Sequence, residues 1–206
     1  MYGAINFRAY VEAIRKAKHF IYIENQYFIG SSYCWVRDTG DRAKHTIPHE
    51  IVKKIISKIE AGQRFTAFIT IPMFPEGDPV DGTTQEILYW QRLTMEAMYT
   101  MIGKALEDNN LADVAHPTDY LMFFCLGKRE AEADIPDCLE APEAGSPAAS
   151  CREHMRHPVY VHSKMMIVDD EYIIIGSANI NQRSMAGARD TEIAFGGFQP
   201  EFMANG

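Results

Sequence analysis

The residues best suited to chemistry lie close together near the end of the chain, around two short apolar stretches. His162 and Lys164 interrupt the first stretch, residues 159–168, which is otherwise rich in β-branched and apolar side chains. That composition predicts a β-strand. Side chains alternate between the faces of a strand, so the imidazole and the ammonium group would share one face, about 7 Å apart along the chain. Two cations so placed repel each other and lose hydration unless an anion lies between them, and the simplest anion is a phosphate.

The second apolar stretch, residues 172–175, is followed by polar groups that suit the same ligand. Ser177 and Asn179 are again two residues apart, and Gly176 before them lets the backbone come close to a ligand because it has no side chain. A phosphodiester held here would meet the fixed charge of Lys164, an amide N–H of Asn179 and the hydroxyl of Ser177. Together these groups would stabilise charge on the phosphoryl oxygens, so the pattern indicates phosphoryl-transfer chemistry.

His162 is the member of this set that can transfer protons near neutral pH, since the unperturbed pKa of imidazole is about 6.5. A carboxylate on the second ring nitrogen usually orients such a base. Two carboxylates are candidates: Asp169, in the acidic turn between the two stretches, and Glu192, further along the chain. Asp169 lies an odd number of residues from His162 and would face away on a regular strand, whereas Glu192 could approach from another segment.

The spacing of these residues resembles the HKD signature of the phospholipase D superfamily, which here reads His162-x-Lys164-x4-Asp169-x6-Gly176-Ser177-x-Asn179. The flanking segments 21–28 (IYIENQYF) and 176–185 (GSANINQRSM) resemble the eukaryotic branch that hydrolyses phosphatidylcholine, and above all the plant type. The resemblance covers most of the chain, roughly residues 7–200, and is weakest at residues 31–49 and 128–157.

The resemblance implies hydrolysis of phosphatidylcholine to phosphatidate and choline, with transfer to a primary alcohol as the competing reaction. It also implies two HKD sets that face each other: one histidine forms a phosphohistidine, and the other protonates the leaving alcohol and then activates water. This chain shows only the second set, so the resemblance gives His162 the acid–base role. It favours Glu192 as the partner of His162 and leaves Asp169 to the turn or to the opposite half of the site. The implied catalytic residues are His162, Lys164, Asp169 and Glu192, with Ser177, Asn179 and Gly176 binding substrate.

The absent first set implies that this chain is one half of a catalytic unit. We prefer a missing half on the same longer chain to a second copy related by C2 symmetry. The other expected partner is a phospholipid membrane surface, which implies a cytoplasmic protein associated peripherally with membranes. The resemblance implies calcium only through a lipid-binding module outside this segment. For the segment itself we predict no cofactor and no metal, because no carboxylates have the spacing of an EF-hand loop.

Composition narrows the function classes. The chain has 206 residues, of which 47% are apolar and 23% charged, as expected for one globular domain. The net charge of −8 argues against nucleic acid as a partner, because such binders need a basic surface. No apolar run is long enough to span a membrane. The four cysteines show no CxxC spacing, which indicates free thiols in a reducing compartment.

Two other functions fit the same residues. One is the same chemistry on another phosphodiester, as in a cardiolipin synthase-like phosphatidyltransferase or a nuclease, although the acidic balance and the GSANINQRSM segment disfavour a nuclease. The other is a catalytically incomplete half that acts as a non-enzymatic module.

The hydrophobic pattern predicts an α/β fold in one domain, residues 1–206. Helices are expected at residues 7–18, 48–62 and 83–109, the last opened by a capping box between Thr83 and Glu86. Alternation of helices with strands implies a mainly parallel or mixed β-sheet flanked by helices. The expected strands are residues 20–28, 64–72, 120–126, 159–168, 172–175 and 191–195.

Two further segments stand out in this pattern. Residues 131–156 are rich in Ala, Glu, Asp and Pro, and residues 128–157 are predicted to form a mobile loop outside the core. Glu24, Asn25 and Gln26 are polar residues at the carboxyl end of the first expected strand. Open α/β sheets bind ligands at this end of their strands, so the three are candidates for residues close to the site.

Overall fold

A mixed β-sheet forms the centre of the protein in the computed structural model, which describes residues 3–37, 43–73, 75–131 and 140–199. Its strands are β1 (Phe20–Asn25), β2 (Thr66–Thr70), β3 (Leu121–Phe124), β6 (Lys164–Val168), β7 (Tyr172–Gly176) and β8 (Ala194–Phe198). They lie in the order β3-β2-β1-β6-β7-β8. The first three strands run parallel to one another, and β6, β7 and β8 join them as antiparallel neighbours. This confirms the predicted α/β fold, and the sheet is mixed.

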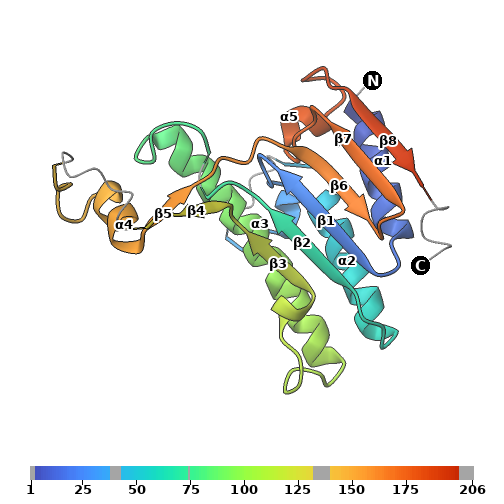
Figure 1. Cartoon of the computed structure of the whole chain (residues 1–206). Coiled ribbons are helices and arrows are strands. Elements are labelled where there is room, and N and C mark those ends of the chain that lie inside the picture. Colours follow the sequence, from blue (N-terminus) through green and yellow to red (C-terminus); the bar gives the residue numbers. More distant parts are fainter. Residues whose placement is uncertain (1–2, 38–42, 74, 132–139, 200–206) are drawn as a thin grey trace.

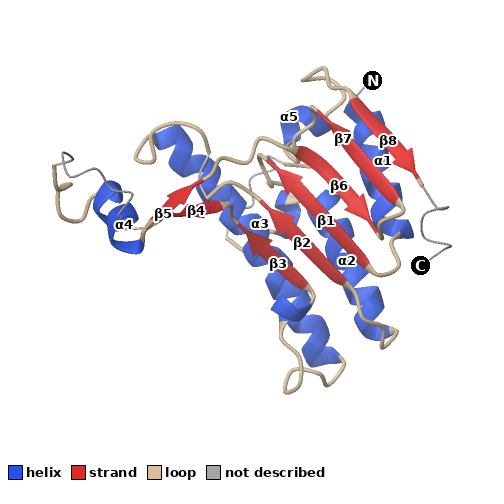
Figure 2. Ribbon diagram, in the orientation of Figure 1, coloured by secondary structure: helices blue, strands red, loops and turns tan. Residues whose placement is uncertain are grey.

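Three helices cover one face of this sheet: α1 (Gly3–Lys16), α2 (Ile47–Glu60) and α3 (Gly82–Asp108) lie behind it in Figures 1 and 2. Alternation along β1 shows which face they cover, because Ile21, Ile23 and Asn25 are fully buried whereas the residues between them are half-buried. The core therefore lies between the helices and this face, and its largest fully buried side chains include Tyr10, Ile14, Ile51, Ile55, Ile69 and Met98.

The opposite face of the sheet is apolar yet carries none of the three long helices (Figure 2). Strand pairing places Tyr22 beside Ile167, and Ile167 beside Ile173. In the next row, Ile175 and Phe195 are neighbours and are 49% and 68% exposed. We call this surface the open face; it is defined by Tyr22, Phe68, Met165, Ile167, Ile173, Ile175 and Phe195.

A small extension projects away from the sheet (Figure 1). Strand β4 (Gly127–Arg129) pairs antiparallel with β5 (Arg156–Pro158), and helix α4 (Pro147–His154) precedes β5. The prediction of a loop over residues 128–157 is therefore corrected for its described part, since backbone pairing between its two ends organises it. Residues 132–139 of that prediction lie outside the described residues.

Several predicted boundaries are wrong for identifiable reasons. Helix α3 begins at Gly82 because the carboxylate of Asp81 accepts a hydrogen bond from the Thr83 N–H at 2.9 Å, so the N-cap precedes the predicted capping box. Strand β6 begins only at Lys164, and β8 begins at Ala194, three residues after the predicted start. The residues that were predicted as strand but precede β6 and β8, 159–163 and 191–193, belong to the segments that lead into the sheet.

Two predictions about the whole chain can be compared with the described residues. None of their helices combines the length and the apolar character that a membrane crossing requires. Cys34 and Cys125 are free thiols, as predicted. Cys138 lies outside the described residues, as does the side chain of Cys151.

His45 is a fully buried histidine that ties the loop before α2 to the segment after β1. Its Nε2–H donates to the carbonyl oxygen of Ile29 at 2.7 Å, and its Nδ1 has no partner among the described residues. Burial lowers the pKa of His45 from 6.5 to about 4. Between these values the unfolded chain binds a proton that the folded protein does not, so stability is complete above pH 6.5 and falls toward pH 4.

We therefore expect the free energy of unfolding, measured by urea titration, to fall on acidification from pH 6.5 to pH 4, with His45 contributing up to about 1.4 kcal/mol per pH unit. His45→Gln keeps a donor for Ile29 but removes the titrating ring, so it flattens this slope. The control His154→Gln, at an exposed residue of α4, leaves the slope unchanged. An unchanged slope in His45→Gln would contradict this assignment.

Candidate active site

The polar residues singled out in the sequence meet at one edge of the sheet. Strand pairing sets Asn25 at the end of β1 beside Lys164 at the start of β6. It likewise sets Gly176 at the end of β7 beside Ala194 at the start of β8. The segments that enter and leave these four strand ends carry Gln26, His162, Ser177, Asn179 and Glu192. The antiparallel insertion of β6 between β1 and β7 thus gathers residues that are far apart in the sequence.

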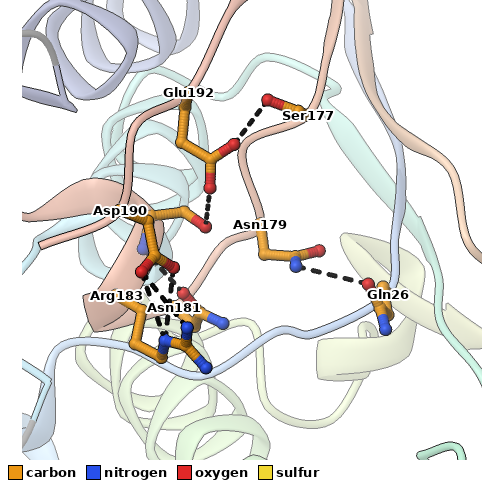
Figure 3. Close-up of polar contacts among 8 residues, drawn as sticks. Gln26, Ser177, Asn179, Asn181, Arg183, Asp190 and Glu192 are labelled. Atoms are coloured by element: carbon orange, nitrogen blue, oxygen red, sulfur yellow. Dashed lines mark hydrogen bonds and ion pairs between the residues drawn. The ribbon is translucent and has the colours of Figure 1, made fainter.

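Lys164 and Asn179 converge on a single oxygen atom. The Lys164 ammonium donates to Gln26 Oε1 at 2.8 Å, and Asn179 Nδ2 donates to the same oxygen at 3.3 Å. Figure 3 shows the amide of Asn179 turned toward Gln26. The ammonium also donates to the backbone carbonyl of His162 at 2.6 Å. Burial lowers the pKa of Lys164, and the negative charge of Glu192 opposes that change.

His162 lies just outside β6 and is exposed. Its ring stacks on Tyr160, with 6.1 Å between centroids and 27° between planes. Gln26 connects to this pair, because its Nε2 donates to the Tyr160 hydroxyl at 2.8 Å. The predicted shared strand face of His162 and Lys164 needs correction, since the strand starts at Lys164; what joins the two residues is the bond from the ammonium to the His162 carbonyl.

Glu192 is held by two serine hydroxyls. Its carboxylate accepts a hydrogen bond from Ser177 and another, at 2.6 Å, from Ser184 of the short helix α5 (Gln182–Met185). Figure 3 shows the carboxylate turned toward Ser177. The predicted pairing with His162 is not formed, because no hydrogen bond joins the two among the described residues. Ser177 is correspondingly engaged with Glu192 and with the backbone N–H of Ile193, at 3.1 Å.

The three polar residues of segment 24–26 have different positions: Gln26 lies in the candidate site, Asn25 is buried below it, and Glu24 lies outside it. Asn25 is fully buried, and its Oδ1 accepts from the Ile180 N–H at 3.0 Å, which ties the segment carrying Asn179 to the end of β1. Glu24 lies beside Met165 at the margin of the open face, where its carboxylate accepts from the Tyr22 hydroxyl at 2.7 Å. Of these three side chains, only that of Gln26 forms hydrogen bonds with the side chains of Lys164 and Asn179.

Comparisons with known proteins identify the family of this chain. A family model described as Phospholipase D matches residues 4–206. The chain belongs to the phospholipase D family. It is 57% identical over 201 residues to Phospholipase D alpha 1 of Oryza sativa subsp. japonica, covering 95% of this chain and 24% of that protein. It is 59% identical over 201 residues to Phospholipase D alpha 3 of Arabidopsis thaliana, with the same coverage. The chain thus spans about a quarter of the length of these relatives.

A solved structure, titled as the phospholipase D family member Nuc from Salmonella typhimurium, covers 96% of this chain and 78% of its own. The superposition has a TM-score of 0.41, and the two sequences are 14% identical.

Asp169 of the phospholipase D signature serves the turn, which is one of the two roles that the sequence left open for it, and its catalytic role stays a prediction. It follows β6 at the end opposite Lys164, where it is buried. Its carboxylate accepts from the backbone N–H groups of Lys18, His19 and Phe20 at 2.6, 2.7 and 2.8 Å. Asp169 and Asp170 both have positive φ and form the tight turn into β7. Asp169 therefore fixes the connection between α1 and β1.

The structure also explains why a glycine occupies position 176 of the signature. A Cβ atom there would overlap the Ile193 carbonyl and the Ala194 backbone of the neighbouring strand. The glycine thus allows β8 to approach β7, while its predicted role in letting a ligand come close stays a prediction.

Two contributors to the phospholipase D site escaped the sequence analysis. Tyr160 lies two residues before His162, so the same spacing of two residues that links His162 to Lys164 could have indicated it. Ser184 sits in a segment without strand periodicity, so only the fold brings it to Glu192. No cluster of three or more His, Cys, Asp or Glu side chains suited to a metal ion occurs within the described ranges.

We expect Asp169→Asn to lower the free energy of unfolding by about 1–3 kcal/mol, because its amide group would face one of the buried N–H donors. Asn still tolerates the positive φ. The matched control Asp170→Asn, at the exposed neighbour in the same turn, should change stability by less than about 0.5 kcal/mol. Urea titration measures both variants. A full-length Asp169→Asn protein that is as stable as wild type but has no turnover would contradict this structural role and support the catalytic assignment.

Proposed function

We propose that this chain supplies one half of the catalytic site of a phospholipase D that hydrolyses phosphatidylcholine to phosphatidate and choline, with transfer to a primary alcohol as the competing reaction. The observation that carries the proposal is the convergence of the Lys164 ammonium and the Asn179 amide on one oxygen, beside His162. A cation and an N–H donor that share an acceptor suit a phosphoryl oxygen. The names of the relatives support the same class of substrate.

In the first step, a histidine of the other half attacks phosphorus and the bond from phosphorus to the choline oxygen breaks. His162 gives its proton to that leaving oxygen, while Lys164 and Asn179 stabilise the charge on a non-bridging oxygen. In the second step, neutral His162 takes a proton from water as the water oxygen attacks phosphorus. The phosphorus–nitrogen bond then breaks and phosphatidate leaves. A primary alcohol in place of water gives the transfer product.

The other half is expected to cover the open face. An apolar sheet face is stable when another layer buries it, and the active-site edge borders this face through Ile175 and Phe195. The relatives extend far beyond the segment they share with this chain, which covers 24% of the rice protein. We propose that the first HKD half of the same longer chain is the occupant, in preference to a second copy of this chain.

The proposed substrate also determines where the protein would act and which partners it would have. Phosphatidylcholine is a membrane lipid, so a cytoplasmic protein of this kind would act while associated peripherally with the membrane surface. Nucleic acid is not proposed as a partner, since the net charge is −8. Any calcium requirement is assigned to segments outside this chain.

In the full-length protein that contains this chain, His162→Ala should lower turnover of phosphatidylcholine vesicles by about 100- to 10,000-fold. Lys164→Ala should lower it by about 100- to 1,000-fold. The matched controls are His157→Ala and Lys128→Ala. These two residues are also a histidine and a lysine that lie side by side, but they are exposed and belong to the β4–β5 extension. Their activity should remain within twofold of wild type. Wild-type turnover in either site variant, or faster turnover of DNA than of lipid, would refute the proposed function.

The isolated chain should show less than about 1% of the full-length turnover, because the nucleophilic histidine is absent, and adding the separately produced first half should restore activity. Phe195→Asp should weaken that association at least tenfold, since it places a charge on the open face. Val114→Asp is the control at a residue that is 78% exposed and lies after α3, outside the open face. Concentration-independent turnover by the isolated chain would count against a divided site.

A further inference from the structure

The side-chain amide of Gln26 occupies the centre of the proposed phosphoryl site. Its Oε1 accepts from Lys164 at 2.8 Å and from Asn179 at 3.3 Å, while its Nε2 donates to Tyr160 at 2.8 Å. The orientation of this amide follows from its neighbours, because an ammonium group only donates and must face the oxygen. Gln26 therefore contacts both proposed phosphate donors and the tyrosine that stacks on His162.

These contacts place Gln26 in competition with the substrate. A phosphoryl oxygen can use the Lys164 and Asn179 donors fully only if the Gln26 oxygen leaves them. An anionic oxygen forms hydrogen bonds about twice as strong as those of a neutral amide oxygen. A phosphodiester can therefore displace Gln26, whereas the neutral carbonyl of a carboxylic ester gains nothing by the exchange.

The backbone around Gln26 allows its side chain alone to move. The Gln26 N–H donates to the Ser163 carbonyl at 3.2 Å, and the preceding Asn25 is anchored to Ile180. The Tyr160 hydroxyl gives the displaced amide a polar neighbour. Displacement thus needs a change of side-chain rotamer and no rearrangement of the sheet.

We propose that the Gln26 carbonyl is a placeholder for a phosphoryl oxygen. It keeps Lys164 and Asn179 paired and oriented while the site is empty, it yields to an anionic phosphoryl group, and it resists neutral carbonyl groups of the same lipid. This inference rests on the proposed function, since it assigns the competing ligand to the same two donors.

The test measures inhibition by inorganic phosphate of the full-length protein acting on a soluble short-chain phosphatidylcholine. Gln26→Met keeps the length of the side chain and removes the competing oxygen, so the inhibition constant should fall about 3- to 10-fold. Gln26→Glu places a carboxylate against Lys164, so the constant should rise at least tenfold near neutral pH and recover as acid protonates the carboxylate.

The control is Gln63→Glu, because Gln63 Oε1 also accepts from a lysine ammonium, that of Lys58, at 2.7 Å, in the exposed segment after α2. Its inhibition constant should stay within twofold of wild type. Thermal unfolding of each variant confirms that it is folded at the assay temperature, and Gln26→Ala replaces Gln26→Met if the latter is not.

The direction of the change separates a placeholder from a support. If Gln26 only positioned Lys164, removing its oxygen would weaken phosphate binding, so an unchanged or raised constant in the folded Gln26→Met protein overturns the inference. That result leaves the proposed function intact as long as the wild-type protein turns over phosphatidylcholine. Absence of both turnover and phosphate inhibition in the wild-type protein refutes the proposed function itself.

Discussion

A half-buried lysine charge needs acceptors, and the edge of the sheet that carries the candidate site supplies them. The Lys164 ammonium is bonded to the His162 carbonyl and to the Gln26 amide oxygen, and the carboxylate of Glu192 opposes the loss of its charge. Desolvation makes an unpaired charge costly, so these contacts fix the position of the ammonium group before any ligand arrives. The same hydrogen bonds orient the neighbouring groups, because Gln26 also accepts from Asn179 and the ammonium holds the backbone of His162.

Much of the signature works by building the fold that holds this lysine. Asp169 collects three backbone N–H groups at the far end of β6, and Gly176 lets β8 lie against β7. Asn25 anchors the backbone of Ile180 beneath the site. A motif residue can therefore have a role in the fold that its spacing alone does not reveal, and this role appears only when its partners are known.

The sequence predicted the elements of the fold well where periodicity was strong. Helix α2 and the strands around β1, β2 and β7 fall within or close to their predicted ranges, since buried apolar residues recur there with the expected spacing. Spacing alone also brought His162, Lys164, Ser177 and Asn179 to one candidate site. The order of the strands was beyond this reasoning, because the pairing of β6 with β1 joins segments about 140 residues apart.

The partners of the polar side chains were harder to predict than their positions. Glu192 was expected to be the carboxylate partner of the His162 ring, but the fold brings the hydroxyls of Ser177 and Ser184 to its carboxylate. Local preference could not anticipate that contact, because α5 has only four residues and no periodic pattern. The role of Gln26 was also hidden, since a polar residue at the end of a strand is equally consistent with an ordinary loop.

A crystal structure of the full-length protein with inorganic phosphate bound tests the central claim most directly. The account predicts one phosphate oxygen within hydrogen-bonding distance of both Lys164 Nζ and Asn179 Nδ2, with the Gln26 oxygen moved away from them and the His162 ring facing the phosphate. Phosphate bound elsewhere, with the contacts from Lys164 and Asn179 to Gln26 intact, would contradict it.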